Sequence, residues 1–225
     1  MAKKLIIFMM SLTMVACSSI SIYATDTAEE DTTATTPTVT SEATTTDSTV
    51  VEATTTTVTA EATTQTVKRT TYSKYRRGLA AYIRSVNSNI GTDKSLSLAG
   101  SFIKYANRRN LDPKVLMAIA ENESHFYTGA CNPAGYYGMM QCSAALANHY
   151  GYKSTSLYKG YVAIDVASRY LKAMKNQFGT YTKAISAYAY GSGTVSTGNY
   201  STALANKLMN TRSSIQRYLE RHNYV

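Results

Sequence analysis

Carboxyl side chains are scarce in the C-terminal part of the chain, so each of them is a candidate for acid–base chemistry. Six lie between residues 67 and 225: Asp93, Asp112, Glu121, Glu123, Asp165 and Glu220. Asp112 precedes Pro113, and an Asp cap followed by Pro in the first helical position is a common helix start. The helix that begins there is expected to end near Ser124, and it carries two of the remaining carboxyl groups.

Helical geometry separates the two glutamates of this segment. At 100° per residue, Val115, Leu116 and Ile119 form one apolar stripe. Glu123 falls within this stripe, whereas Glu121 falls on the opposite side. A carboxyl group on an apolar stripe loses hydration, so its pKa rises toward the range that a general acid needs near neutral pH. Glu123 is therefore the candidate acid, and the alternative is a structural glutamate paired with a basic side chain.

The first residues are typical of an export signal. Lys3 and Lys4 precede an apolar stretch, and small residues near Ala24 offer a cleavage site, so residues 1–24 are predicted to be a signal peptide. Secretion of the chain is the first expectation. The alternative is lipoprotein processing, which would leave a lipid anchor on Cys17.

The two other cysteines, Cys131 and Cys142, suggest a disulfide, because an exported domain meets an oxidising environment. The alternative is two separate buried thiols. The histidines His125, His149 and His222 are scattered and do not complete a zinc-binding set with these cysteines. We expect no metal and no cofactor.

Composition divides the remaining chain into two parts. Residues 25–66 contain 20 Thr, eight acidic side chains and no Lys or Arg, whereas residues 67–225 contain 21 basic and six acidic side chains. The first part predicts a disordered Thr-rich linker over residues 25–70. The second predicts a basic domain over residues 71–225 that is long enough to bury its own core. Its charge favours an acidic polymer as partner, and without a binding motif we expect no nucleic acid partner.

The basic domain is predicted to be mainly helical. Apolar residues recur at helical spacing over residues 77–90, 96–107, 113–124, 139–150, 162–178, 181–190 and 203–221. Gly-rich stretches at 128–138 and 191–198 predict loops, and no stretch shows convincing strand alternation. The expected architecture is a single compact helical domain behind the signal peptide and the linker, and a monomer is expected.

Three short motifs follow one another at characteristic distances. Glu123-Ser124 ends a helix, Gly138-Met139-Met140-Gln141 comes next, and Ala187-Tyr188-Ala189-Tyr190-Gly191 lies further on. This order resembles the soluble lytic transglycosylase family, whose catalytic domain is related to goose-type lysozyme. The resemblance covers about residues 98–204. It departs most from the family pattern at Ala189, where the family usually has Asn.

The resemblance implies a lysozyme-like α+β fold and peptidoglycan glycan strands as substrate, so the protein would act outside the cell or at the cell wall. Glu123 would cleave the bond between N-acetylmuramic acid and N-acetylglucosamine and leave a 1,6-anhydro end, with no cofactor. The expected substrate-binding residues are Ser124, Tyr137, Gly138, Met139, Met140, Gln141 and Tyr188.

Other functions remain open at this point. A water molecule in place of the sugar hydroxyl would make the protein a muramidase hydrolase, and a degenerate site would make it a peptidoglycan-binding stalk protein. A Cys-His peptidase that uses Cys142 and His149 is conceivable, but the expected disulfide would consume its nucleophile.

Overall fold

The computed structural model describes the backbone of residues 51–225 and the side chains of residues 63–225. The predicted signal peptide, Cys17 and the linker up to residue 50 lie outside the described residues. A boundary between two compact units falls between Thr70 and Thr71.

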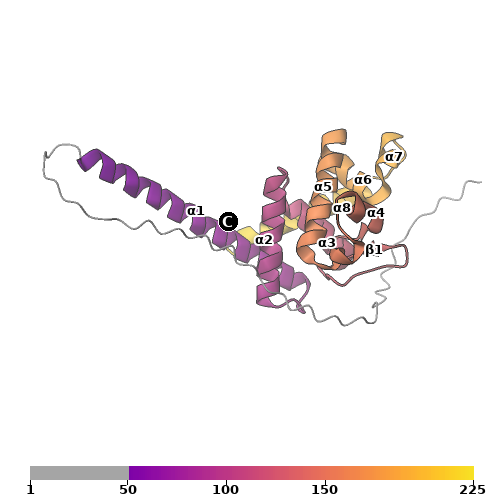
Figure 1. Cartoon of the computed structure of the whole chain (residues 1–225), viewed down its shortest axis with the longest axis horizontal. Helices are drawn as coiled ribbons and strands as arrows, with labels where there is room; N and C mark the ends of the chain where they lie inside the picture. Colours follow the sequence, from indigo (N-terminus) through magenta and orange to yellow (C-terminus); the bar gives the residue numbers. More distant parts are fainter. Residues whose placement is uncertain (1–50) are drawn as a thin grey trace, which may run out of the picture. The chain divides into compact units, whose positions relative to one another are not determined.

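Helices dominate the described residues (Figure 1). The elements are α1 (Val51–Val86), α2 (Thr92–Arg108), α3 (Pro113–Ser124), β1 (Tyr136–Tyr137), β2 (Cys142–Ser143), α4 (Ala144–His149), the 3-10 helix η1 (Ser154–Tyr158), α5 (Gly160–Phe178), α6 (Tyr181–Tyr190), α7 (Ser192–Ser196) and α8 (Ala203–Arg221). The predicted fold class is confirmed in that the described residues are mainly helical. No helix among these residues combines the length and apolar character needed to cross a membrane.

Helix α1 corrects the expected linker. It begins at Val51, so the last part of the stretch expected to be disordered is helical. The side chains of residues 63–70 are all exposed, and therefore burial does not stabilise the helix there. The helix instead continues back from the segment that packs on the domain, because adding a residue to an existing helix costs much less than starting one.

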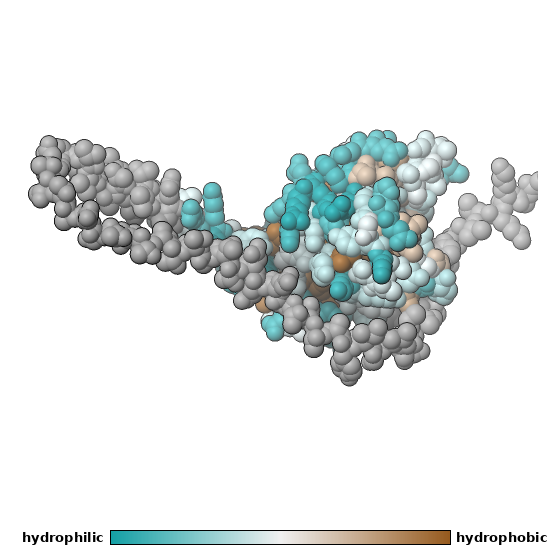
Figure 2. Space-filling model, in the orientation of Figure 1, coloured by the Kyte–Doolittle hydropathy of each residue, from teal (hydrophilic) through white to brown (hydrophobic). Residues whose placement is uncertain are grey.

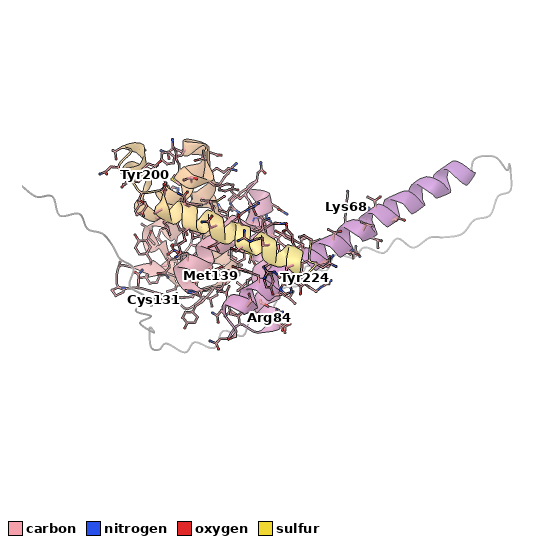
Figure 3. All side chains as sticks on the ribbon, turned by 180° about the vertical axis from the view of Figure 1, so that it is seen from behind. Lys68, Arg84, Cys131, Met139, Tyr200 and Tyr224 are labelled. Atoms are coloured by element: carbon pink, nitrogen blue, oxygen red, sulfur yellow. The ribbon has the colours of Figure 1, made fainter. Side chains whose placement is uncertain are left out.

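The packed end of α1 meets the C-terminus of the chain. A Cβ atom on Gly78 would lie 2.5 Å from Cγ of Tyr224 and 2.6 Å from Cδ2 of Leu219. Gly78 therefore permits close contact between α1 and the residues that end and follow α8. Figure 3 shows Tyr224 beside α1 at this junction.

Helix α3 is the central helix of the domain, and it packs against α2, α5 and α8 (Figure 1). All six residues from Val115 to Ala120 are buried, because this apolar run covers every side of the helix. The Asp112 carboxylate caps its start by accepting a hydrogen bond from the Lys114 amide at 2.9 Å. Arg212 of α8 holds the same carboxylate at 2.7 Å, so the cap also ties α8 to α3.

The only sheet within the described residues is a short antiparallel pair, in which Tyr136 faces Ser143 and Tyr137 faces Cys142. The predicted helix over residues 139–150 is wrong in its first half, since α4 begins only at Ala144. Short helix α7 likewise occupies part of the predicted loop at 191–198. Outside the core, Figure 2 shows a mostly hydrophilic face with scattered hydrophobic residues.

A buried ion cluster joins α2 to α5. Asp165 is only 2% exposed and pairs with Arg109, the C-cap residue of α2, and, at 2.9 Å, with Arg169 on its own helix. The Tyr152 hydroxyl adds a third hydrogen bond at 3.2 Å. Because two guanidinium groups converge on one dry carboxylate, the loss of that charge would leave Arg109 without its partner.

We expect Asp165→Asn to lower the free energy of unfolding by about 3–5 kcal/mol, the usual cost of breaking a buried ion pair from one side. Urea unfolding followed by circular dichroism measures this change. The matched control is Asp93→Asn, because Asp93 is exposed and forms no ion pair within the described residues. Its expected cost is below about 1 kcal/mol. Equal losses in the two variants would contradict the role given to the cluster.

Candidate active site

Glu123 lies in the last turn of α3 and is half-buried. Burial raises the pKa of its carboxyl group to about 7, while the Asn122 amide and the Lys207 ammonium hold it below the value that burial alone would give. The hydrogen bond from Asn122 Nδ2 to Glu123 Oε1 is long, at 3.4 Å. A carboxyl group with so little compensation is close to half protonated at neutral pH, as a general acid requires.

Glu121 and Glu123 are similarly exposed, but they differ in the hydrogen-bond partner of their carboxyl groups. Both side chains are half-buried, so the expected contrast between a buried and an exposed face is weaker than helical geometry predicts. The reason is that α3 is surrounded on nearly all sides. Glu121 accepts a hydrogen bond of 2.8 Å from the Tyr82 hydroxyl, which gives it a structural partner that Glu123 lacks.

The segment Gly138–Gln141 is fixed beside the end of α3 by two hydrogen bonds, one from α3 itself and one from α6. Ser124 Oγ donates to the Met139 carbonyl at 2.9 Å. The Tyr188 hydroxyl of α6 donates to the Met140 carbonyl at 2.7 Å. The three motifs that are separate in the sequence therefore meet at these two carbonyl groups.

The backbone of this segment is a tight turn. Gly138 has φ +70°, and a side chain there would collide with the Leu157 carbonyl. Gln141 has φ +46°, an uncommon value outside glycine. Its amide donates to the Gly138 carbonyl at 2.9 Å and accepts from Asn132 at 3.0 Å. These two bonds hold Gln141 in its strained conformation.

The predicted substrate-binding residues therefore fall into two groups. The side chains of Met139 and Met140 are fully buried and Ser124 is only 3% exposed, so these residues support the turn from the core. Tyr137 and Tyr188 are half-buried, and their rings pack edge-on or tilted against Tyr158 and Tyr170. Figure 3 shows Met139 within the domain and Cys131 at its edge.

Both cysteines are free, which corrects the expected disulfide. Cys131 forms a backbone bridge with Tyr137, and Tyr137 pairs on its other side with Cys142. A strand therefore separates the two cysteines. Two strand spacings amount to about 9.6 Å, whereas a disulfide needs Cα atoms closer than about 7 Å.

The Cys142 thiol is buried under Tyr188, whose hydroxyl lies 3.6 Å from its Sγ. Burial raises the pKa of this thiol to about 12, and the Glu123 charge adds to the effect. A thiol that stays protonated is a poor nucleophile. His149 is exposed and its ring meets that of Tyr150 edge-on. The structure therefore supports neither residue of the Cys-His peptidase alternative.

Two site residues were missed by the sequence analysis. Lys207 of α8 donates to Asn122 Oδ1 at 3.0 Å, and Asn122 in turn contacts Glu123. Both line a hollow of about 210 Å³ together with Glu121, His125 and Thr211. Lys207 lies far from Glu123 in the sequence, and no local pattern indicates their proximity. No group of three His, Cys, Asp or Glu within the described part of the chain could hold a metal ion.

Fold and site together define a mainly helical domain with one desolvated glutamate at the end of its central helix. Residues 100–209 match the family model of the transglycosylase SLT domain. The matched stretch contains Glu123, the Gly138–Gln141 turn and Tyr188. The predicted resemblance is thus confirmed over residues 100–209, which match the transglycosylase SLT domain.

Solved structures similar to this chain are lytic transglycosylases. An inactive mutant of Slt from Pseudomonas aeruginosa is 22% identical over 56% of this chain, with a TM-score of 0.44. The 70 kDa soluble lytic transglycosylase from Escherichia coli is 24% identical over 65% of this chain, with a TM-score of 0.45. A complex of the 70 kDa enzyme with bulgecin A is 25% identical over 65%, also at 0.45. The match covers 24% of the first of these chains and 29% of the other two.

The raised pKa of Glu123 has a consequence for stability. A carboxyl group with pKa 4.5 in the unfolded chain and about 7 in the folded chain keeps its proton longer when folded. Folding stability therefore decreases as the pH rises from about 4.5 to about 7, by up to about 3 kcal/mol. We expect Glu123→Gln to be more stable than the parent protein at pH 8 and similar to it at pH 4.5.

Thermal unfolding of both proteins at these two pH values measures the difference. Glu121→Gln serves as control, because it weakens the bond to Tyr82 without relieving a desolvated charge. It should gain no stability at pH 8. A stabilised Glu121→Gln, or a Glu123→Gln variant without any gain at pH 8, would contradict the assignment of the desolvated carboxyl group to Glu123.

Proposed function

We propose that this protein is a peptidoglycan lytic transglycosylase in which Glu123 serves as both general acid and general base. The observation that carries the proposal is the half-buried Glu123 carboxyl group with a pKa near 7 inside the SLT domain. The resemblance of the three motifs to the family, now joined at one turn, supports the same assignment.

The other described carboxyl groups support a one-carboxylate mechanism. Asp112 and Asp165 are held in ion pairs, and Glu121 is held by Tyr82. Asp93 and Glu220 are exposed on other helices, α2 and α8. Glycosidases that use two carboxyl groups place them on either side of the scissile bond. No second group of this kind is available beside Glu123 among the described residues.

In the first step of the proposed reaction, protonated Glu123 donates its proton to the oxygen between N-acetylmuramic acid and N-acetylglucosamine. The bond from muramoyl C1 to that oxygen breaks, and the N-acetylglucosamine part leaves with the proton. The substrate's own acetamido group stabilises the cation at C1. The Glu123 carboxylate then accepts the proton of the muramoyl C6 hydroxyl, whose oxygen bonds to C1 and closes the 1,6-anhydro ring. Glu123 ends the cycle protonated, as it began.

Export to the cell wall belongs to this proposal, since peptidoglycan lies outside the cytoplasm. The predicted signal peptide and the possible lipid anchor at Cys17 lie outside the described residues and stay predictions, as does the monomeric state. The strong positive charge of residues 67–225 suits a polymer that carries carboxylates.

The proposed role of Glu123 predicts a large loss of activity in Glu123→Gln. The amide keeps the size of the side chain but can neither donate nor accept the proton, so the rate should fall at least ~100-fold. Glu121→Gln should keep most of the activity. The assay is release of soluble fragments from purified cell wall, followed by mass analysis.

The products distinguish the alternatives. Anhydro ends support the transglycosylase, reducing ends would indicate a muramidase hydrolase, and the absence of fragments would indicate a binding protein. An inactive Glu121→Gln with an active Glu123→Gln would overturn the choice of the acid.

Lys207 should set the upper pH limit of activity. The reaction starts from protonated Glu123, so the rate falls as the pH rises through the pKa of that group. The Lys207 cation lowers this pKa, and the groups that face Glu123 from β2 and α6, Cys142 and Tyr188, have raised pKa values and stay neutral. Lys207→Met should therefore shift the alkaline limb of the pH–rate profile to higher pH.

The conservative variant Lys207→Arg keeps the charge and should leave the alkaline limb in place. A purely structural role of Lys207 would lower the rate at every pH without moving the limb, and that result would contradict the prediction.

A further inference from the structure

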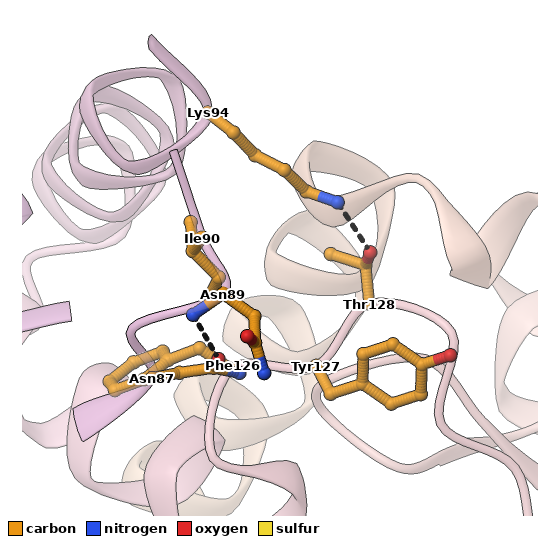
Figure 4. Close-up of a pocket in the computed structure, with 7 residues that line it drawn as sticks. All are labelled: Asn87, Asn89, Ile90, Lys94, Phe126, Tyr127 and Thr128. Carbon is orange, nitrogen blue, oxygen red and sulfur yellow. Dashed lines mark hydrogen bonds between the residues drawn. The ribbon is translucent and has the colours of Figure 1, made fainter. Parts of the chain in front are cut away.

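A second hollow lies directly beyond the end of α3, between the α1–α2 connection and the residues that follow His125 (Figure 4). Its volume is about 280 Å³, just below the range of ordinary ligand pockets, so it suits a small chemical group. The lining residues are Asn87, Asn89, Ile90, Lys94, Phe126, Tyr127 and Thr128. The proposed reaction of Glu123 does not use any of them.

The position of this hollow is fixed by the turn that ends α3. His125 and Phe126 both have positive φ, at 50° and 63°, so the chain reverses sharply after Ser124. The Asn87 side chain donates to the His125 carbonyl at 2.9 Å and holds the turn against the end of α1. The Tyr127 amide bonds to the Ser124 carbonyl at 3.0 Å. The hollow is therefore built on the same turn that ends the helix of Glu123.

The side chains around the hollow have unused hydrogen-bonding capacity. Lys94 donates one hydrogen bond, to Thr128 Oγ1 at 3.0 Å, and forms no salt bridge within the described residues. Its two other ammonium protons are therefore not bonded to a carboxylate of these residues. Asn89 is exposed, and its backbone amide donates to the Asn87 side-chain oxygen at 3.2 Å, whereas its side-chain amide forms no hydrogen bond with other described residues. Figure 4 shows Lys94 reaching across to Thr128 with the Tyr127 ring nearby.

The remaining lining is apolar or aromatic. Phe126 is fully buried and Ile90 is 7% exposed, so together they form a dry floor. Tyr127 is 46% exposed, and Gly129 leaves room for its ring, since a Cβ there would lie 2.8 Å from it. No carboxylate lines the hollow. A free cation, an amide and a hydroxyl around an apolar floor suit a small group that combines a carboxylate with short alkyl parts.

We propose that this hollow is a subsite for the carboxylate-bearing substituent of muramic acid, with Lys94 as its anion-binding residue. The inference rests on the proposed function, which supplies a substrate whose alternate sugars carry such a substituent. The carboxylate can come from a stem peptide or, on a strand without peptides, from the lactyl group itself. Because the subsite shares a turn with Glu123, it would select which muramic acid residues are presented for cleavage.

The experiment uses the full chain with Glu123→Gln, so that ligands bind without being cleaved. Calorimetric titration compares three soluble ligands of equal sugar length: a peptide-bearing glycan fragment, the same fragment stripped of its peptides, and a chitooligosaccharide, which lacks both carboxylates. Lys94→Met in this background should weaken binding of the peptide-bearing fragment by roughly tenfold or more. It should leave the chitooligosaccharide unchanged, and Lys94→Arg should restore much of the loss.

The matched control is Lys183→Met, which removes the same charge from an exposed position on α6 and should change no affinity. A loss confined to the peptide-bearing fragment identifies the stem-peptide carboxylate as the ligand. An equal loss on the stripped fragment, in which the lactyl carboxylate is free of its peptide, shows that the subsite binds either carboxylate. Equal losses on all three ligands, or equal effects of Lys94→Met and Lys183→Met, would overturn the subsite.

Failure of the subsite is distinct from failure of the proposed function. The parent protein is assayed separately for fragments released from cell wall. If the parent protein releases anhydro fragments but Lys94→Met changes no affinity, only the subsite is rejected. If the parent protein releases no fragments, the proposed function is rejected, whatever the titrations show.

Discussion

Two backbone carbonyl groups organise the candidate site. The Met139 carbonyl accepts from Ser124 at the end of α3, and the Met140 carbonyl accepts from Tyr188 on α6. Both methionine side chains are anchored in the core, so the turn that carries them cannot shift without disturbing the packing. Glu123 therefore lies beside a turn, Gly138–Gln141, that is held by core packing and by hydrogen bonds from α3 and α6. Rigid support of this kind matters because a misplaced group can cost on the order of 100-fold in rate.

The same two hydrogen bonds explain where sequence analysis failed locally. Met139 and Met140 have the apolar spacing of a helix, and a helix over 139–150 was expected. In a helix their carbonyls would accept from amides four residues later; here they accept from distant side chains instead. Gly138 and Gln141 take positive φ and close the turn. A local sequence pattern contains no information about distant side chains that bond to these carbonyl groups in place of helical amides. The pattern therefore predicts a helix where the structure has a turn.

Features with local causes were predictable. The cap at Asp112 and the buried run of α3 follow from their own residues, and α5, α6 and α8 lie within two residues of their expected bounds. The place of Glu123 on the apolar stripe predicts its partial burial, which the structure shows, while its catalytic role stays a proposal. The prediction of a disulfide could not be corrected from the sequence, because the spacing of the two cysteines does not show that the strand of Tyr137 lies between them. Lys207 was missed for the same reason: only the packing of α8 on α3 brings its charge to Asn122.

The neighbours of Glu123 suit its proposed role, in which the same carboxyl group both gives and takes a proton. Burial raises the pKa of Cys142 and of Tyr188, so both stay neutral near pH 7, and neither offers a fixed charge that would lock Glu123 in one state. The cation that acts on it, Lys207, reaches it through the Asn122 amide instead of forming a direct ion pair. A direct pair would hold the carboxylate ionised and remove its acid function. Attenuating that charge through an amide keeps the pKa near neutrality, where both protonation states are accessible in one catalytic cycle.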